Sequence, residues 1–338
     1  MIGRAATALA IVVLLAACSP DPAETPTYSP TPTPSSEGNH DTVTNPVYAF
    51  DFPDPQVLPV DGGYLGIATN GSEMNVQTIH SDDLISWSLG VDALPSVADW
   101  SSSGKVWAPE IIAWPDGSFR LYYSTKAPDP AWQCVSVASA DTLEGPFEDA
   151  SKEPLMCEIE EGGSIDASPF VDEDGTAYLY WKNDGNAVGV DTWIRAAKLS
   201  GDGLSVEGET TNLFKQDLPW EGHLVEGPAV VKVDGVYHMF YSANDYGSDA
   251  YAVGHAVSDS PLGPFVKDGD PVLATNELAA GPGHCQLFKE GDQWWMVYHA
   301  WVPGHVGDSA SGRQMWLSKV SFDGETVEVQ PPVEHPLG

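Results

Sequence analysis

One short pattern recurs five times along the chain, and it constrains the fold more than any other feature of the sequence. Each copy has a proline, a short apolar stretch, a turn that contains glycine, and a second stretch rich in aromatic residues. The five prolines are Pro55, Pro109, Pro169, Pro228 and Pro282, and consecutive ones are 54 to 60 residues apart. Repeats of this length, each with room for about four strands, are typical of the blades of a β-propeller.

The turns and the second strands keep the same period. The turns are Asp-Gly or Gly-Asp pairs, which favour tight hairpins because glycine accepts a positive φ. The aromatic stretches are 64–67, 119–123, 178–181, 237–241 and 294–298. No long stretch has the periodicity of a helix. The sequence therefore predicts an all-β, five-bladed β-propeller over residues 46–335 with no second domain. A β-sandwich would not explain one element that recurs five times.

The residues before this domain have a different composition. Arg4 precedes a short apolar run that ends in small residues and Cys18, which is typical of a secretory signal and resembles that of a bacterial lipoprotein. Residues 1–17 are therefore interpreted as a lipoprotein signal peptide, with the lipid on Cys18; the alternative is an ordinary signal with a chance cysteine. The Pro/Thr/Ser-rich segment 18–45 predicts a disordered tether.

The charge of the chain limits its partners. It has 14 Lys and Arg against 49 Asp and Glu, a net charge of −35. A nucleic-acid partner is not expected, because no basic surface is available to neutralise phosphates, and the same holds for docking on anionic lipid. We expect membrane contact only through the lipid on Cys18, export to the bacterial cell surface or the extracellular space, and a monomer.

Three cysteines lie in the predicted propeller. Cys134 and Cys157 belong to one stretch and would face an oxidising compartment, so they form either a disulfide or two buried thiols. Cys285 has no clear base partner in the sequence and is interpreted as a small buried apolar residue.

Three carboxylates fall at nearly the same place in three repeats. Asp54 stands one residue before its repeat proline, Asp166 three before and Glu226 two before. The innermost strand of a propeller blade lines the central channel, so the three side chains should meet at one mouth of it. Crowded carboxylates repel one another, and some then stay protonated near neutral pH. A proton donor beside an ionised base is what glycosidic bond cleavage needs. The alternatives are solvated surface acids or a calcium site.

At these residues the sequence resembles glycoside hydrolase family 43, a family of five-bladed propellers. Six motifs occur in the order of that family and cover nearly the whole chain after residue 45. They are Phe52-Pro53-Asp54-Pro55, Ser81-Asp82-Asp83-Leu84-Ile85-Ser86-Trp87, Trp107-Ala108-Pro109-Glu110, Ser164-Ile165-Asp166-Ala167-Ser168-Pro169-Phe170, Val225-Glu226-Gly227-Pro228 and Gly281-Pro282-Gly283-His284. Ala167 departs from the pattern, since many members carry proline there.

The resemblance implies a role for each acid. Asp54 would be the general base that activates water, Glu226 the general acid, and Asp166 the residue that holds the acid in place and raises its pKa. It further implies inversion of configuration, and α-L-arabinofuranosides and β-D-xylosides as substrates. The predicted function is thus a glycoside hydrolase acting on arabinose- or xylose-containing polysaccharides or oligosaccharides, with no cofactor required for the chemistry.

Three further residues are candidates for the surroundings of the acids. Trp107 should lie near the channel mouth and pack on a sugar ring, or else between blades. The resemblance implies that Arg313 contacts sugar hydroxyls; a salt bridge is the alternative. It also implies that His284 helps to hold a central ion, often a structural calcium, largely through water. A histidine on an apolar strand is otherwise a core residue.

Two other functions fit parts of the pattern. A non-catalytic glycan-binding propeller would use the aromatic residues without the acids, and a fructan hydrolase would retain configuration. The sugar and the linkage depend on the loops at one face of the channel, for which the sequence suggests 95–106, 183–193, 242–250 and 301–312.

Overall fold

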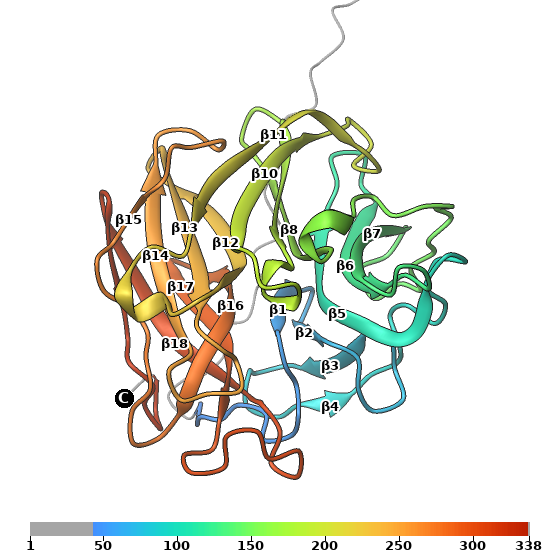
Figure 1. Ribbon diagram of the computed structural model, residues 1–338. Helices are drawn as coiled ribbons and strands as arrows, with labels where there is room; N and C mark the ends of the chain where they lie inside the picture. Colours follow the sequence, from blue (N-terminus) through green and yellow to red (C-terminus); the bar gives the residue numbers. More distant parts are fainter. Residues whose placement is uncertain (1–42, 337–338) are drawn as a thin grey trace, which may run out of the picture.

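The computed structural model describes residues 43–336, and in this part of the chain nineteen strands form five antiparallel sheets arranged in a ring (Figure 1). The five-bladed β-propeller predicted from the repeat is confirmed. The predicted signal peptide, the lipid on Cys18 and nearly all of the predicted tether lie outside the described residues. Within the described part of the chain, no helix is long and apolar enough to cross a membrane.

The first two blades follow the first two repeats. Blade 1 contains β1 (Gln56–Val60), β2 (Gly63–Ala68), β3 (Gln77–Ser81) and β4 (Ser88–Leu89). Blade 2 contains only three strands, β5 (Ser102–Ala113), β6 (Phe119–Lys126) and β7 (Gln133–Ala140). An isolated bridge between Ser139 and Glu148 stands where its fourth strand would pair.

The other three blades have four strands each. Blade 3 contains β8 (Ser164–Val171), β9 (Ala177–Asn183), β10 (Trp193–Leu199) and β11 (Val206–Lys215). Blade 4 contains β12 (Val225–Val233), β13 (Val236–Ala243), β14 (Ala252–Ser258) and β15 (Val266–Lys267). Blade 5 contains β16 (Ala280–Glu290), β17 (Gln293–Trp301), β18 (Gln314–Asp323) and β19 (Thr326–Val329). Between residues 43 and 336, helical structure is limited to the 3-10 turns η2 (Ile159–Glu161), η3 (Gly185–Ala187) and η4 (Pro219–Glu221).

The apolar core lies between neighbouring blades, where the aromatic second strands pack face to face. Tyr180 of blade 3 and Tyr241 of blade 4 belong to one such buried cluster. The ring closes because residues before β1 pack on the last blade. Tyr48 pairs with Met315 of β18, and the Asn45 side chain donates to the backbone of Leu317 and accepts from it. Burial of this segment fixes blade 5 against blade 1.

In every blade, one residue in or just before the innermost strand has a φ in the left-handed region at an equivalent position; β5 and β16 also contain Gly104 and Gly281, which have positive φ. The five equivalent residues are Asp54, Ala108, Asp166, Gly227 and His284, with φ between 42° and 58°. In β5, β8, β12 and β16 the pairing register shifts at this point, as in a β-bulge, which bends a strand and re-aims its side chains. The five residues therefore define one level of the central channel, which we call the kink level.

Side chains in the second strands, or directly after the second strand in the case of Thr69, hold four of the five kinks in place. The backbone N–H of Ala108, Asp166, His284 and Asp54 donates to a side chain of the preceding blade. The acceptors, in the same order, are Thr69 Oγ1 at 2.8 Å, Ser124 Oγ at 3.0 Å, Ser242 Oγ at 2.7 Å and His299 Nδ1 at 3.1 Å. The kink level is thus held by bonds between blades as well as within them.

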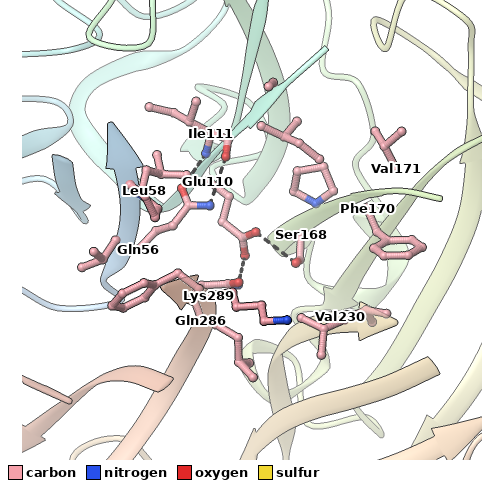
Figure 2. Close-up of a pocket in the computed structure, with 18 of the residues that line it drawn as sticks. Gln56, Leu58, Glu110, Ile111, Ser168, Phe170, Val171, Val230, Gln286 and Lys289 are labelled. Atoms are coloured by element: carbon pink, nitrogen blue, oxygen red, sulfur yellow. Dashed lines mark hydrogen bonds between the residues drawn. The ribbon is translucent and has the colours of Figure 1, made fainter. Parts of the chain in front are cut away.

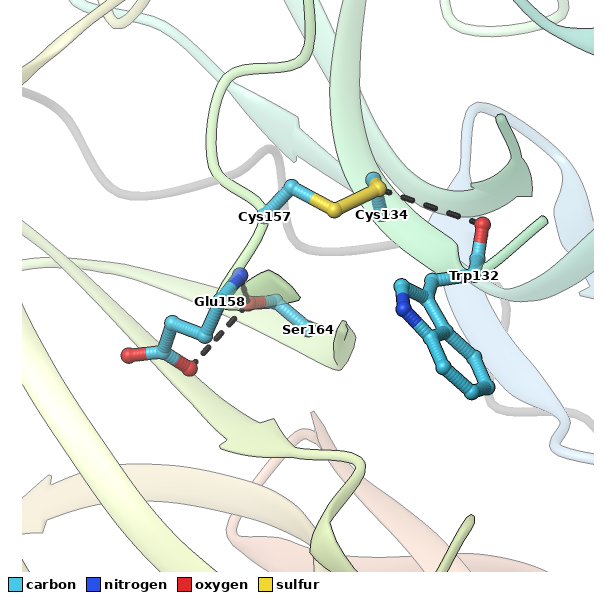
Figure 3. Close-up of a disulfide and its surroundings, with 5 residues drawn as sticks. All are labelled: Trp132, Cys134, Cys157, Glu158 and Ser164. Atoms are coloured by element: carbon cyan, nitrogen blue, oxygen red, sulfur yellow. Dashed lines mark hydrogen bonds between the residues drawn. A yellow bond between two sulfur atoms is a disulfide. The ribbon is translucent and has the colours of Figure 1, made fainter. Parts of the chain in front are cut away.

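The bonding states of the three cysteines in the propeller agree with the sequence analysis. Cys134 and Cys157 form a disulfide, which joins β7 to the segment that leads to η2 (Figure 3). Glu158 and Ser164 lie directly beside it. Cys285 is a free, buried thiol, as expected, and burial raises its pKa.

Candidate active site

The three predicted acids meet at the kink level, at the end of the channel where the inner strands begin. Asp54 and Asp166 occupy two kinks, and Glu226 directly precedes the third, at Gly227. The exposed fractions of Asp54 and Glu226 are only 10% and 12%. The three acids stand at different distances from their repeat prolines for two reasons. In blade 3, two residues separate the kink from the proline, whereas in blade 1 they are adjacent. Glu226 lies one position before its kink rather than at it.

Asp54 lies in a group of positive and hydrogen-bonding side chains. Arg313 Nη1 donates to Oδ1 at 3.0 Å, and the Thr69 hydroxyl donates to Oδ2 at 2.5 Å. The Nδ1 atoms of His284 and His299 lie 3.5 Å and 3.2 Å from Oδ1. Burial by itself would raise the pKa of the Asp54 carboxyl, but the Arg313 and His284 charges outweigh it and hold the pKa well below its usual range. Asp54 is therefore ionised, as a base must be.

Asp166 has the opposite electrostatic character. Burial raises its pKa to about 6, and the neighbouring charges of Glu226 and Asp54 act in the same direction, against His284 and Lys182. Its Oδ2 accepts the backbone N–H of Gly227 at 3.0 Å, so this carboxyl lies beside the chain that carries Glu226. Asp166 can therefore hold a proton next to the predicted acid.

Glu226 is held by two donors. Lys182 Nζ donates to Oε2 at 3.0 Å, and the Tyr251 hydroxyl donates to Oε1 at 2.8 Å. Burial would raise the pKa of Glu226, but Lys182 and then Tyr251 lower it below its ordinary value. Tyr251 also stacks on His299, with ring centroids 5.7 Å apart and nearly parallel planes. One tyrosine thus connects the surroundings of the acid and the base.

This tyrosine depends on a glycine in the fifth blade. A Cβ atom on Gly283 would lie 2.1 Å from the Tyr251 ring, so any larger residue there would push the ring away from Glu226. The Gly281-Pro282-Gly283-His284 motif therefore shapes the site through packing as well as through its histidine.

Trp107 and Arg313 lie at the mouth. Trp107 directly precedes the kink at Ala108, the same offset that Glu226 has from its own kink, and 39% of its surface is exposed. Arg313 bonds Asp54 and also lies over the half-exposed Tyr246 ring, 4.8 Å from its centroid. Tyr246 and Arg313 belong to or directly follow the loops 242–250 and 301–312, which the sequence analysis singled out.

His284 occupies the kink of the fifth blade and faces Asp54. Among residues 43–336, no group of three or more His, Cys, Asp and Glu side chains is placed to hold a metal ion, so the donor set does not fit an ion bound directly by several side chains. An ion held by His284 largely through water, as the resemblance implied, stays a prediction.

A fourth carboxylate lies one layer deeper in the channel. Glu110 follows its kink by two residues, as Gln56, Ser168 and Gln286 follow theirs. Figure 2 shows Glu110 between Ser168 and Gln286, and both side chains donate to it. Burial raises the pKa of Glu110 well above its usual range, despite the Ser168 hydrogen bond. A cavity of about 670 Å³ continues from this layer along the inner strands, away from the trio.

Several residues of the site were not predicted from the sequence. Thr69, Lys182, Tyr251 and His299 contact the acids directly. One signal could have found three of them, since Thr69, Ser124, Lys182, Ser242 and His299 stand at the same register of five second strands, 55 to 60 residues apart. Tyr251 precedes a third strand and gave no comparable signal.

A comparison with protein families identifies the family of the chain. The model of the family described as glycosyl hydrolases family 43 matches residues 43–327, from before the first blade into the last strand of the fifth. The chain belongs to glycoside hydrolase family 43. The resemblance stated from the six motifs is confirmed.

Relatives of this family 43 chain carry names that refer to different substrates. It is 28% identical to a β-D-galactofuranosidase of Aspergillus niger, with 85% of this chain and 84% of the relative covered. It is also 28% identical to an arabinoxylan arabinofuranohydrolase of Paenibacillus polymyxa, over 84% of this chain but only 48% of that protein. A β-xylosidase of Xylanibacter ruminicola is 26% identical, over 70% of this chain and 82% of the relative.

Solved structures agree with the family and the fold. A thermostable family-43 glycoside hydrolase superimposes with a TM-score of 0.78 at 30% identity, covering 87% of this chain and 98% of the other. An endo-1,4-β-xylanase from Bacteroides thetaiotaomicron gives a TM-score of 0.72 at 29% identity, with the same coverage. The chain is thus a glycoside hydrolase of family 43, a family whose members differ in substrate.

Proposed function

We propose that this glycoside hydrolase cleaves arabinose- or xylose-containing polysaccharides or oligosaccharides with inversion of configuration, as an α-L-arabinofuranosidase or a β-xylosidase. One observation carries the proposal: three carboxylates from three blades meet at one channel mouth, where Asp54 is held ionised and Asp166 retains a proton up to a pH of about 6. The relatives named as arabinofuranohydrolase and β-xylosidase support the choice of sugars.

In the proposed reaction Asp54 takes a proton from a water molecule, whose oxygen forms a new bond to the anomeric carbon. The bond from that carbon to the leaving oxygen breaks on the opposite face. The proton that Asp166 and Glu226 share passes to Glu226, which gives it to that oxygen, so that both carboxyls end the step ionised. Asp54 stays charged in the free enzyme because of Arg313 and His284, and Asp166 keeps a proton beside Glu226. This division of one base and one proton-bearing pair is the arrangement that inverting hydrolysis requires.

Trp107 and Arg313 are proposed to bind the substrate. The exposed face of Trp107 offers an apolar surface to the C–H face of a sugar ring, and Arg313 can donate to a hydroxyl while it stays bonded to Asp54. We also propose export, with a lipid anchor on Cys18, on the evidence of the N-terminal sequence.

Two measurements test the function. Wild-type protein should release 4-nitrophenol from α-L-arabinofuranoside or β-D-xyloside substrates, and ¹H NMR should show the inverted anomer first. Glu226→Gln and Asp54→Asn should each lower kcat by at least about a hundredfold. Glu325→Gln, on the exposed turn between β18 and β19, is the matched control and should behave as wild type. Glycan binding without any hydrolysis would instead support a non-catalytic propeller, and a retained anomer would exclude the inverting mechanism.

A further inference from the structure

Five equivalent residues, one from each blade, lie beside the kink level at the second strands, and one of them is chemically different from the other four. Thr69, Ser124, Ser242 and His299 each accept the backbone N–H of the next blade's kink residue. In blade 3 this position is Lys182, which pairs with Ile165 just as Ser242 pairs with Glu226. A lysine ammonium group has no acceptor, so it cannot fasten the kink at Gly227.

Two changes follow from this lysine. The Gly227 N–H donates to Asp166 Oδ2 instead, at 3.0 Å, which binds the proton-bearing acid to the strand that carries Glu226. The Lys182 ammonium group turns to carboxylates, with Nζ 3.0 Å from Glu226 Oε2 and 3.6 Å from Asp184 Oδ1. Its side chain is only 1% exposed.

A buried ammonium group is costly to keep at a structural position that a hydroxyl fills in three other blades. Its carboxylate partners are what make its burial tolerable, and one of them is the predicted general acid. Lys182 is charged, because Glu226, Asp166 and Asp184 together outweigh the effect of burial and raise its pKa. Lys182 therefore stabilises the predicted general acid, Glu226, rather than the contact between the two blades.

Resting on the hydrolytic function proposed above, we propose that Lys182 is a positioning residue for Glu226, which fixes the orientation of this carboxyl and decides how the proton is divided between Asp166 and Glu226. The positive charge of the ammonium group stabilises the ionised form of Glu226. The proton that the two carboxyls share therefore resides on Asp166 in the free enzyme. The other groups that face Glu226 are the Tyr251 hydroxyl, which acts in the same direction, and His284. Asp184 is the second carboxylate near the Lys182 ammonium group and competes with Glu226 for it.

The test is the pH dependence of kcat/KM in Lys182→Met and Lys182→Arg. Without the positive charge, Glu226 and Asp166 keep their proton to higher pH, so the alkaline limb of Lys182→Met should move up by about 1–3 pH units. The acid limb should stay in place, because it reports Asp54, on which Lys182 is not among the main influences. Lys182→Arg keeps the charge and should keep the alkaline limb of the wild type.

A merely structural role gives a different result. Ser242→Ala removes the corresponding bond between blades and should lower stability without moving the alkaline limb, which makes it the matched control. If Lys182→Met lost activity or stability but kept the wild-type alkaline limb, Lys182 would be a structural residue and the proposal would be wrong.

A second measurement needs neither a folded Lys182→Met protein nor an active enzyme. With ¹³C-labelled carboxyl groups, assigned through Glu226→Gln and Asp166→Asn, NMR should show that Glu226 of the wild-type protein titrates at lower pH than Asp166. The reverse order would overturn the proposal. If the protein hydrolysed no glycoside, the proposed function would fail, while this titration would still test the order of the two carboxyls that the role of Lys182 requires.

Discussion

The contact between Arg313 and Asp54 predicts how the enzyme behaves in acid. The guanidinium Nη1 lies 3.0 Å from Oδ1, and the two side chains are 16% and 10% exposed. Opposite charges at this distance attract by about 5.5 kcal/mol at an effective dielectric constant of about 20. Since one pKa unit corresponds to about 1.36 kcal/mol, the attraction is worth at most about 4 units. Asp54 keeps His284, His299 and Thr69 in the variant, so we expect a smaller change.

The substitution Arg313→Met removes the charge and keeps the length of the side chain. It should raise the pKa of Asp54 by about 1–3 units, so that the acid limb of kcat/KM moves up by that amount. The sign follows from the role of the group, because a base that holds its proton to higher pH is inactive over a wider acid range. The alkaline limb should not move. A lost sugar contact would raise KM at every pH, which the shape of the profile separates from the shift.

Arg195→Met is the matched control. Arg195 is also largely buried, but it pairs with Glu158 and Glu161 beside the disulfide, and it is not among the main influences on Asp54. Both variants would be assayed with an aryl glycoside from about pH 3 to about pH 9. If the acid limb of Arg313→Met coincided with those of the wild type and Arg195→Met, Arg313 would not be what keeps Asp54 ionised.

Three further predictions concern binding and stability. Trp107→Ala should raise KM about threefold to tenfold with little change in kcat, because a stacking face worth ~0.5–1.5 kcal/mol is lost; an unchanged KM would place the sugar elsewhere. Replacing Cys134 and Cys157 by serine should lower the free energy of unfolding by about 3 kcal/mol, as expected when a link spanning 23 residues is opened, and urea titration would reveal an unchanged midpoint if the link were unimportant. Burial lowers the pKa of His238 to about 4, below its value in the unfolded chain, so this ring costs stability as the pH falls from about 6.5 to about 4. His238→Asn keeps a donor toward His255 and cannot be protonated, so its stability in urea should fall less over that window; an equal fall would contradict this assignment.

The repeat made most of the fold predictable. Prolines and glycine turns at near-constant spacing depend only on local backbone chemistry, so five blades and their aromatic second strands could be recognised without coordinates. The convergence of Asp54, Asp166 and Glu226 followed from the same periodicity, because equivalent positions of a closed ring lie at one level. The three-stranded second blade was not foreseen, since a bridge at Ser139 and Glu148 leaves no distinct pattern.

The partners of the acids were decided by the tertiary structure. Four of the five kink residues are not glycine, and Asp54, Ala108, Asp166 and His284 share no side-chain property that announces a positive φ. The kink sets the direction in which the acid side chain points. The residue that contacts this side chain then comes from the neighbouring blade. Whether that partner is a hydroxyl, an imidazole or the ammonium group of Lys182 determines which carboxyl carries a proton. Local sequence therefore placed the acids at one level, whereas the contacts between blades set their charge.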